Sequence, residues 1–261
     1  MLSQELATKK CKAIVSSLET FGSVDGPGVR YVVFLQGCNL RCRYCHNPET
    51  WTKTSPDAKE WSPEDLFNLA WKYHFYWGKN MENGGITVSG GEPLLQIDFL
   101  IEFFKLAKAK GVHTCIDTAG QPFCRDSAFL EKFNELMKLT DLFIVDIKAF
   151  DAKLHKELTG FENQNILDFM RYLSDNGKAM WIRHVLVPKL TDSEEDLTNT
   201  KNFIESLKTV ERVEVLPYHT LGIFKWKKLG IKYSLEDAEP PTKEEVLRAE
   251  KLLNVDKYKN K

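Results

Sequence analysis

Three of the six cysteines in this chain lie within one short stretch, GCNLRCRYCHN (37–47). They are Cys38, Cys42 and Cys45, at the spacing C-x3-C-x2-C. Thiolates are soft ligands that suit zinc and iron–sulfur clusters. A [4Fe-4S] cluster is usually held by four cysteines, so three neighbouring ones would leave one iron open to an outside ligand. The spacing therefore favours a cluster with an open coordination position.

A zinc ion is the alternative occupant of these three cysteines. A structural zinc site needs four protein ligands in a tetrahedron. His46 directly follows Cys45, which makes tetrahedral closure awkward, and Cys115 and Cys124 stand at no distinctive spacing. Buried cysteines without any ligand role are a third possibility. The residues alone leave these alternatives open.

The composition limits the classes of partner and compartment. A formal charge of −1 over 261 residues gives no reason to expect broad binding to nucleic acid or membrane surfaces. No apolar run approaches the ~20 residues of a membrane span. The first residues, MLSQELATKKCK, lack the apolar stretch of a secretory signal. We therefore expect a cytoplasmic protein, whose cysteines are metal ligands or reactive thiols and not disulfides.

The cysteine loop must be positioned by the elements around it, and their pattern is regular. Short, nearly continuous apolar runs predict strands that are covered on both faces, at 31–37, 85–91, 113–120, 142–149, 180–188 and 212–219. Helical patterns alternate with them at 64–77, 99–111, 126–139, 165–177 and 196–208, and a last helix is expected from Thr242, where Glu245 completes a capping box. Strand–helix alternation predicts parallel strands in a barrel, a partial barrel or a doubly wound sheet. With no linker in the sequence, we expect a single α/β domain over residues 1–261.

Polar residues gather at the carboxyl ends of these predicted strands, where α/β folds bind their ligands. The cysteine loop follows the first strand and should reach the same rim. The predicted site comprises Cys38, Cys42, Cys45, Gly90, Gly91, Glu92, Asp117, Asp146, Lys148, Arg183 and His219.

The C-x3-C-x2-C motif after a first strand resembles that of the radical S-adenosylmethionine (SAM) superfamily. The longer stretch VDGPGVRYVVFLQGCNLRCRYCHNPETW resembles the activating enzymes of glycyl radical enzymes, in particular the type that acts on pyruvate formate-lyase. Further matches are SGGEP, HTCIDTAG, DLFIVDIKA, WIRHVLVP and LPYHTLGIFKW. The resemblance implies a partial (β/α)6 TIM-like barrel of the radical SAM type. It also implies one [4Fe-4S] cluster on Cys38, Cys42 and Cys45, whose open iron binds the amino and carboxylate groups of SAM. Residues 47–84 contain no cysteine, which disfavours activases with accessory clusters.

Further residues are expected to contact SAM. Gly90 and Gly91 would let the backbone approach the ligand, Glu92 would accept hydrogen bonds from its ammonium group, and Arg183 would reach its carboxylate. Asp117 and Thr118 would bind SAM, bind a monovalent cation beside Asp146, or only orient the turn. The resemblance supports the remaining contacts, which are Tyr44, Cys45, His46, Asp146, Ile147, Lys148 and His219.

The activity implied by the resemblance is reductive cleavage of SAM to a 5′-deoxyadenosyl radical, which takes a hydrogen from a glycine of pyruvate formate-lyase. No side chain needs to act as a general acid or base. Reduced flavodoxin is the expected electron donor. Asp25 and Arg30, in VDGPGVR, would hydrogen-bond the incoming glycine loop, unless this segment is an ordinary turn. The alternatives are an activase of another glycyl radical enzyme and a zinc-stapled binding module without catalysis.

Overall fold

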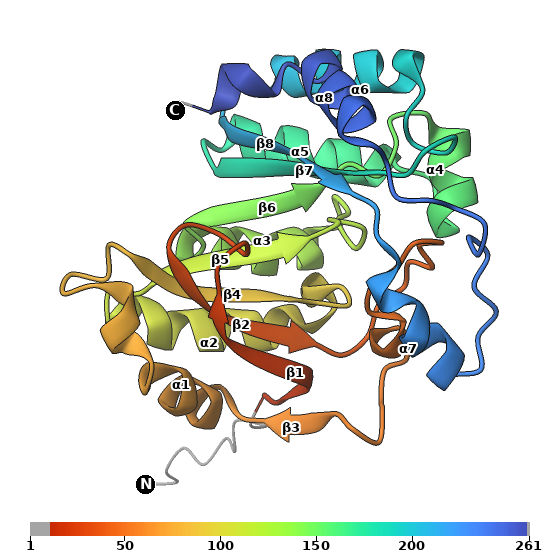
Figure 1. Cartoon of the computed structure of the whole chain (residues 1–261). Helices are drawn as coiled ribbons and strands as arrows, with labels where there is room; N and C mark the ends of the chain where they lie inside the picture. Colours follow the sequence, from red (N-terminus) through yellow and green to blue (C-terminus); the bar gives the residue numbers. More distant parts are fainter. Residues whose placement is uncertain (1–10, 260–261) are drawn as a thin grey trace, which may run out of the picture.

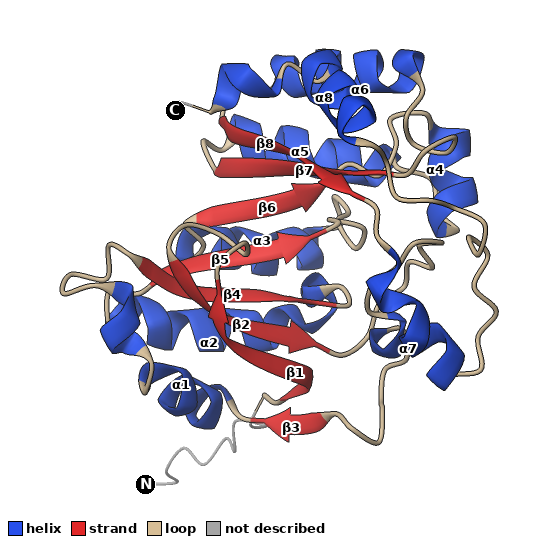
Figure 2. Cartoon of the chain, viewed as in Figure 1, coloured by secondary structure: helices blue, strands red, loops and turns tan. Residues whose placement is uncertain are grey.

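A computed structural model describes residues 11–259 of the chain. One eight-stranded sheet runs through the described residues, in the order β3-β1-β2-β4-β5-β6-β7-β8 (Figures 1 and 2). The strands are β1 Ala13–Gly22, β2 Val29–Leu35, β3 Lys59–Trp61, β4 Gly84–Gly90, β5 His113–Thr118, β6 Leu142–Asp146, β7 Ala179–Leu186 and β8 Val210–Pro217. The expectations for the first ten residues concern a segment outside the described part.

Six of these strands, from β2 to β8 without β3, are parallel and adjacent in chain order. Each overlaps one strand predicted from the sequence. The sheet does not close, since β3 and β8 stand at its two ends. The prediction of a partial barrel with six parallel strands is therefore confirmed.

Helices connect the parallel strands and cover the outer face of the sheet (Figure 1). They are α1 Pro63–Trp71, α2 Ile97–Ala109, α3 Ser127–Leu139, α4 Ala152–Thr159, α5 Gln164–Asp175, α6 Glu194–Ser206, α7 Ile223–Lys228 and α8 Lys243–Leu252. Short 3-10 turns cover Pro48–Thr50, His74–Trp77, Pro93–Gln96, Thr220–Gly222 and Val255–Tyr258. The capping box that Thr242 and Glu245 predicted is present at the start of α8. None of the described helices combines the length and apolar character that a membrane crossing requires.

Strands β1 and β3 and helices α4 and α7 were not predicted. Strands β1 and β3 extend the sheet on the β2 side as antiparallel neighbours. The single helix expected over residues 64–77 is divided, because α1 ends at Trp71 and a 3-10 turn follows. The ring of His74 stacks on that of Trp71 with centroids 4.3 Å apart, so the 3-10 turn packs against the end of α1.

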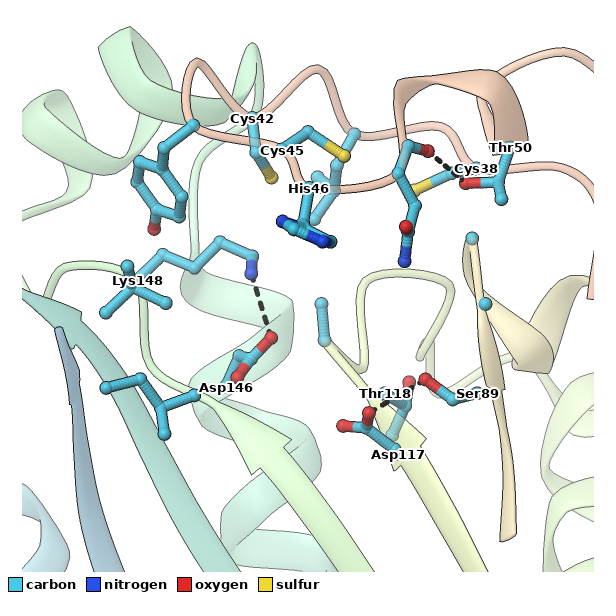
Figure 3. A pocket seen from close by; sticks show the side chains of 18 of the residues that line it. Cys38, Cys42, Cys45, His46, Thr50, Ser89, Asp117, Thr118, Asp146 and Lys148 are labelled. Carbon is cyan, nitrogen blue, oxygen red and sulfur yellow. Dashed lines mark hydrogen bonds and ion pairs between the residues drawn. The ribbon is translucent and has the colours of Figure 1, made fainter. Parts of the chain in front are cut away.

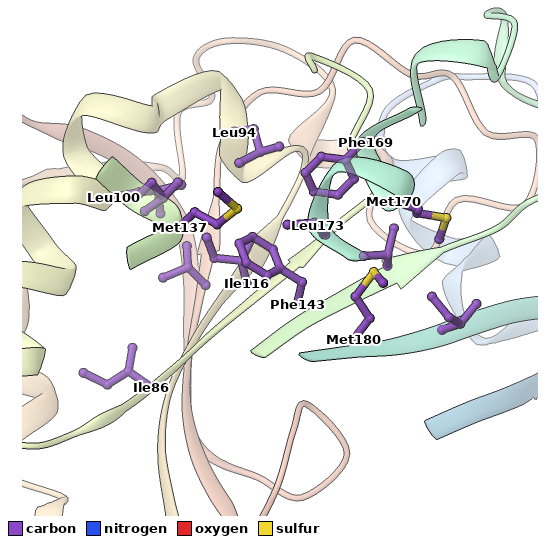
Figure 4. Close-up of a cluster of buried hydrophobic side chains, with 14 of the residues drawn as sticks. Ile86, Leu94, Leu100, Ile116, Met137, Phe143, Phe169, Met170, Leu173 and Met180 are labelled. Atoms are coloured by element: carbon purple, nitrogen blue, oxygen red, sulfur yellow. The ribbon is translucent and has the colours of Figure 1, made fainter. Parts of the chain in front are cut away.

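The main hydrophobic core lies between the parallel strands and the helices that cover them (Figure 4). It includes the fully buried Ile116, Phe143, Phe169 and Leu173. A smaller core lies at the carboxyl ends of the strands and consists of Val187, Tyr218, Trp226, Tyr233 and Leu235. This second core packs against the cysteine loop, so the loop has its own support.

Candidate functional site

A cavity of about 280 Å³ opens at the carboxyl ends of the parallel strands (Figure 3). The cysteine loop after β2 forms one wall, and polar side chains from the ends of β4, β5 and β6 form the other. The expected residues that line it are Cys38, Cys42, Tyr44, Cys45, His46, Gly90, Gly91, Asp117, Thr118, Asp146, Lys148 and His219. Three expected SAM contacts, Glu92, Ile147 and Arg183, do not line it, and neither do the expected partner contacts Asp25 and Arg30.

The three cysteines have free thiols, and Figure 3 shows them together on the upper wall of the cavity. Burial raises the pKa of Cys38 and of Cys45 to about 12, and it also raises the pKa of Cys42. The thiols therefore stay protonated unless strong positive charge arrives, and metal ions supply such charge. This donor set fits an iron–sulfur cluster. The described residues contain no group of three or more His, Cys, Asp or Glu side chains placed around one metal ion.

The backbone of the cysteine loop rests on the carboxyl end of α4. The N–H of Arg41 donates to the carbonyl of Thr159 at 2.8 Å, and that of Arg43 donates to the carbonyl of Leu158 at 2.9 Å. Carbonyl groups in the last turn of a helix have no partner within the helix, so these bonds satisfy both elements. The unpredicted helix α4 thus fixes the position of the cysteines.

Gly90 and Gly91 bring two backbone segments together. A Cβ on Gly90 would lie 2.2 Å from the nitrogen of Leu35, and one on Gly91 would lie 2.1 Å from the carbonyl oxygen of Gly37. The N–H of Gly91 donates to the Leu35 carbonyl at 2.9 Å. These glycines are required because the β4 turn lies directly against the start of the cysteine loop.

Glu92 is fully buried beneath the cavity, with its carboxylate turned toward β5. It accepts hydrogen bonds from the hydroxyl of Thr118 at 2.5 Å and from the backbone N–H groups of Leu94 and Ala119, each at 3.1 Å. Burial raises its pKa to about 7, although these donors work in the opposite direction. In this arrangement Glu92 joins the ends of β4 and β5.

Asp146 and Lys148 face the same side, as their alternation predicted, and form an ion pair of 2.9 Å (Figure 3). Burial works against the charge of Lys148, but Asp146, Cys42 and Tyr44 together raise its pKa well above the usual value. Lys148 therefore stays a cation inside the cavity. Ile147 between them is 2% exposed and belongs to the main core.

Asp117 is the second carboxylate in the cavity. Burial and the neighbouring Asp146 raise its pKa to about 6, against the lowering effects of Arg183 and a hydrogen bond of 2.8 Å from the Ser89 hydroxyl. Its charge thus depends on pH and on any cation that enters. Ser89 was not among the predicted site residues, because a serine inside a strand carries no distinctive signal.

Arg183 lies below the cavity, on β7, and is committed to other groups. Its Nε is 3.0 Å from Glu214, one of its terminal nitrogens is 3.8 Å from Asp117, and the other donates to the carbonyl of Val24. It therefore ties the 22–28 loop to the floor of the site and holds one carboxylate of the cavity.

Aromatic groups form the far side of the cavity. The hydroxyl of Tyr44 is buried and has no hydrogen-bond partner among residues 11–259. The rings of His46 and His219 meet edge to face, with centroids 4.9 Å apart. A buried hydroxyl without a partner is costly, so this one fits a site that is completed by a ligand. Trp51 and Tyr218 also line the cavity and were not predicted, because neither belongs to a distinctive motif.

Asp25 and Arg30 belong to the 22–28 loop and its junction with β2. Arg30 is fully buried, and its guanidinium donates to the Thr87 hydroxyl at 3.0 Å and to the Ile86 carbonyl at 2.6 Å. Such a group holds the loop against β4 and does not reach out to an incoming chain. Burial raises the pKa of Asp25, and the positive charges of Arg183 and Arg30 partly oppose this increase.

The radical SAM superfamily signature matches residues 32–200. The pyruvate formate-lyase-activating enzyme of Streptococcus mutans is 51% identical over 250 residues, covering 96% of this chain and 94% of that protein. That of Listeria monocytogenes is 52% identical over 245 residues, covering 94% and 97%. The chain belongs to the radical SAM superfamily and to its family of pyruvate formate-lyase-activating enzymes.

Two solved structures share this fold. A domain of the pyruvate-formate lyase-activating enzyme from Bacteroides vulgatus is 25% identical, with a TM-score of 0.54, and covers 66% of this chain and 93% of that one. Streptococcus suis SuiB bound to its precursor peptide SuiA gives a TM-score of 0.60 at 19% identity, over 87% of this chain and 46% of that one. Membership of the radical SAM superfamily favours the cluster over the zinc module among the alternatives for the three cysteines.

Proposed function

We propose that this chain activates pyruvate formate-lyase by generating a glycyl radical on it, with SAM as the co-substrate. The observation that carries the proposal is the wall of three free cysteines over a strand-end cavity, in a chain 51% identical to an activating enzyme over 96% of its length. One electron and one SAM give methionine and a 5′-deoxyadenosyl radical. That radical takes a hydrogen atom from a partner glycine and leaves as 5′-deoxyadenosine.

Cys38, Cys42 and Cys45 would hold the [4Fe-4S] cluster, which when bound supplies the electron for cleaving the sulfonium bond. The protein's own contribution is to bind and orient SAM. Lys148, a buried cation, would attract the SAM carboxylate, while Asp117 and Asp146 would attract its positive groups. The Tyr44 hydroxyl and the His46–His219 pair would contact the nucleoside. No proton transfer by a side chain is required.

A monovalent cation beside Asp117 and Asp146 belongs to the same proposal. Burial, with a smaller contribution from Asp146, raises the pKa of Asp117, so a positive charge beside these two carboxylates would stabilise their charged forms. SAM affinity should therefore depend on the cation present. Isothermal titration with SAM in potassium, sodium or choline chloride at one ionic strength would measure this dependence. Equal affinities in the three salts would rule out the cation site.

Reduced flavodoxin in the cytoplasm is the electron donor that we propose. Helix α7 carries Lys227 and Lys228 beside the exposed Phe224 and covers the cysteine loop, through a bond of 2.9 Å from Trp226 Nε1 to the Cys45 carbonyl. Acidic flavodoxins would find complementary charge there. Stopped-flow reduction of the reconstituted protein at increasing salt would test it, because electrostatic steering weakens with ionic strength.

The decisive experiment uses electron paramagnetic resonance. Anaerobically reconstituted protein is reduced and mixed with SAM and pyruvate formate-lyase, and a glycyl radical signal should appear. With partner enzyme deuterated at glycine, deuterium should pass into 5′-deoxyadenosine. Deoxyadenosine that forms at one rate with and without pyruvate formate-lyase, and carries no deuterium, would exclude that enzyme as substrate. A parallel arm with other glycyl radical enzymes covers the alternative target.

A further inference from the structure

Two tryptophan side chains form hydrogen bonds with Cys45. Nε1 of Trp226, on α7, donates to the Cys45 carbonyl at 2.9 Å. Burial raises the pKa of the Cys45 thiol, and a hydrogen bond with the Trp51 side chain partly opposes this increase. The only polar group of a tryptophan side chain is its indole N–H, which can donate but cannot accept. Nε1 of Trp51 therefore donates to the sulfur of Cys45.

The bond from Trp51 adds to donors that belong to the backbone of the cysteine loop. Each of the three thiols accepts a hydrogen bond from a backbone N–H. These donors are Leu40 for Cys38, Cys42 for its own thiol, and Asn47 for Cys45. Donors of this kind come with the fold of the loop, whatever its side chains are. Trp51 is a side-chain donor, so a substitution can remove its bond without altering the loop backbone.

The segment that carries Trp51 is fixed by the end of β2. The side-chain nitrogen of the buried Gln36 donates to the carbonyls of Glu49 and Thr52, on either side of the tryptophan, each at 2.8 Å. The Trp51 ring also packs edge to face against that of Trp226, with centroids 4.9 Å apart. Backbone and ring are both held, so the direction of the indole N–H is fixed.

A cation lies over the face of the Trp51 ring. The guanidinium of Arg41 is 5.2 Å from the ring centroid. Its Nη1 donates to the carbonyls of Cys38 and Leu40, at 2.6 Å and 2.7 Å, which holds the charge above the ring. A cation on the face of an aromatic ring attracts its π electrons. Electron density is thereby drawn away from the indole nitrogen, which makes its N–H a stronger donor.

A donor to a ligand sulfur affects the redox chemistry of a cluster. Hydrogen bonds to the sulfurs and exclusion of solvent are among the factors that set cluster potentials. Reduction adds one negative charge, and the thiolate sulfurs carry part of it. A hydrogen bond to such a sulfur is therefore stronger in the reduced state than in the oxidised state, and it favours reduction. Burial of the Cys45 thiol limits screening of this effect by solvent.

We propose that Trp51 is a positioning residue that sets the reduction potential of the cluster through its hydrogen bond to Cys45. The bond raises the potential, so the electron donor can reduce the cluster more readily. Trp51 itself transfers neither an electron nor a proton. This inference rests on the proposed function, because it concerns the electron that starts SAM cleavage.

The test removes the indole N–H and keeps the shape of the ring. Benzothienylalanine, an analogue of tryptophan with sulfur in place of the N–H, is incorporated at position 51 of the full chain by amber suppression. Reduction of the reconstituted protein is then titrated potentiometrically without SAM and followed by electron paramagnetic resonance. The equilibrium constant for reduction should fall about tenfold, which is about 59 mV for one electron. Trp51→Phe, which also lacks the N–H, should shift the potential in the same direction.

Trp226 supplies the matched control, because its N–H bonds the carbonyl of the same cysteine and not the sulfur. Benzothienylalanine at position 226 should leave the potential nearly unchanged. Resonance Raman spectroscopy gives a second readout, since loss of a hydrogen bond to a ligand sulfur strengthens the iron–sulfur bond. The iron–cysteine stretching bands should move to higher frequency with the analogue at position 51 and stay in place with the analogue at position 226.

An unchanged potential with benzothienylalanine at position 51 would overturn the inference. An equal fall with the analogue at either position would also overturn it, because the cause would then be altered packing or solvent access. Neither measurement uses the partner enzyme. Failure of the proposed function would appear separately, as a natural chain that binds a reducible cluster but gives no glycyl radical on pyruvate formate-lyase.

Discussion

At the scale of single residues, the site is built from ionisable groups that are held where burial and charge conflict. Burial raises the pKa of Glu92 to about 7, and burial with the neighbouring Asp146 raises that of Asp117 to about 6. The carboxylate of Glu92 accepts three hydrogen bonds from donors within the protein, whereas Asp117 lines the cavity. A positively charged ligand would therefore interact with the carboxylate of Asp117, while Glu92 would keep its structural hydrogen bonds.

SAM binding should depend on pH through Asp117. Its carboxyl is protonated below about pH 6 in the free protein, and the charged form attracts a cationic ligand. Affinity should thus be full above pH 6 and fall below it, by at most about tenfold per pH unit for one coupled proton. Titrations of SAM between pH 5 and pH 8 would measure this. Asp117→Asn should bind more weakly at pH 8 and lose the dependence; a variant with the same pH profile as the natural protein would assign it to another group.

Substitution of a cysteine in the loop should abolish cluster binding and SAM cleavage, whereas substitution of a cysteine outside the loop should not. Cys42→Ala removes a thiol that lines the cavity, so the reconstituted protein should lose its cluster and all SAM cleavage. Cys124→Ser, at an exposed position, is the matched control and should keep both. Iron and sulfide analysis with deoxyadenosine assays would compare them. Full iron content and activity in Cys42→Ala would refute the ligand assignment.

At the scale of elements, the segment after β6 is fixed from below by α6. Asp196, 4% exposed in the first turn of α6, accepts hydrogen bonds from the backbone N–H groups of Phe150 at 3.1 Å and Asp151 at 2.7 Å. Asp151 caps α4, whose far end supports the cysteine loop. The carboxylate of Asp196 therefore helps to position the segment that carries Lys148 and, through α4, the cysteine loop.

Asp196→Asn should accordingly weaken the site from a distance. The amide keeps the shape but replaces a charged acceptor, a loss of about 1.5–3 kcal/mol in the free energy of unfolding. SAM affinity should fall while the cluster content stays near normal. Glu195→Gln, the exposed neighbour on the same helix, is the control. Chemical denaturation and SAM titration would report both quantities, and equal stability of the two variants would rule out this role for Asp196.

The elements also show what the sequence could and could not predict. Six apolar runs were sufficient for the parallel strands, because strands covered on both faces are continuously hydrophobic. Strand β1 alternates buried and partly exposed residues, and β3 has three residues, so neither produces such a run. Helix α4 has eight residues of mostly polar character and was missed for the same reason.

Most of the expected SAM contacts line one cavity, but the directions in which the site's side chains point were not predictable. The sequence correctly brought the strand ends and the cysteine loop together, because carboxyl ends of parallel strands share one rim. It could not show that Glu92 turns toward β5 or that Arg183 turns toward Glu214 and the Val24 carbonyl. Those choices depend on contacts between segments far apart in the chain.

At the scale of the whole molecule, the site is supported by a core of its own. Trp226 and Tyr233 of the smaller core pack near Trp51 of the cysteine loop, with the Trp51 and Trp226 rings edge to face at 4.9 Å. The larger core lies on the other side of the sheet ends, among the helices. The structure around the cysteines can therefore loosen without disturbing the rest.

Removal of the cluster should consequently destabilise only the part of the structure around the cysteine loop. Without the positive charge of the cluster irons the three thiols are protonated. The cysteine loop then also loses the cluster that would link Cys38, Cys42 and Cys45. Amide exchange should accelerate by about tenfold or more in residues 38–51 and 218–235, since a loss of about 1.4 kcal/mol gives a factor of ten. Helices α2, α3 and α5, which pack in the larger core, should keep their protection. Exchange measured before and after chelation, and again after reconstitution, would show this. Acceleration spread evenly over the whole chain would mean that the cluster supports one cooperative fold and that the two cores are not separable.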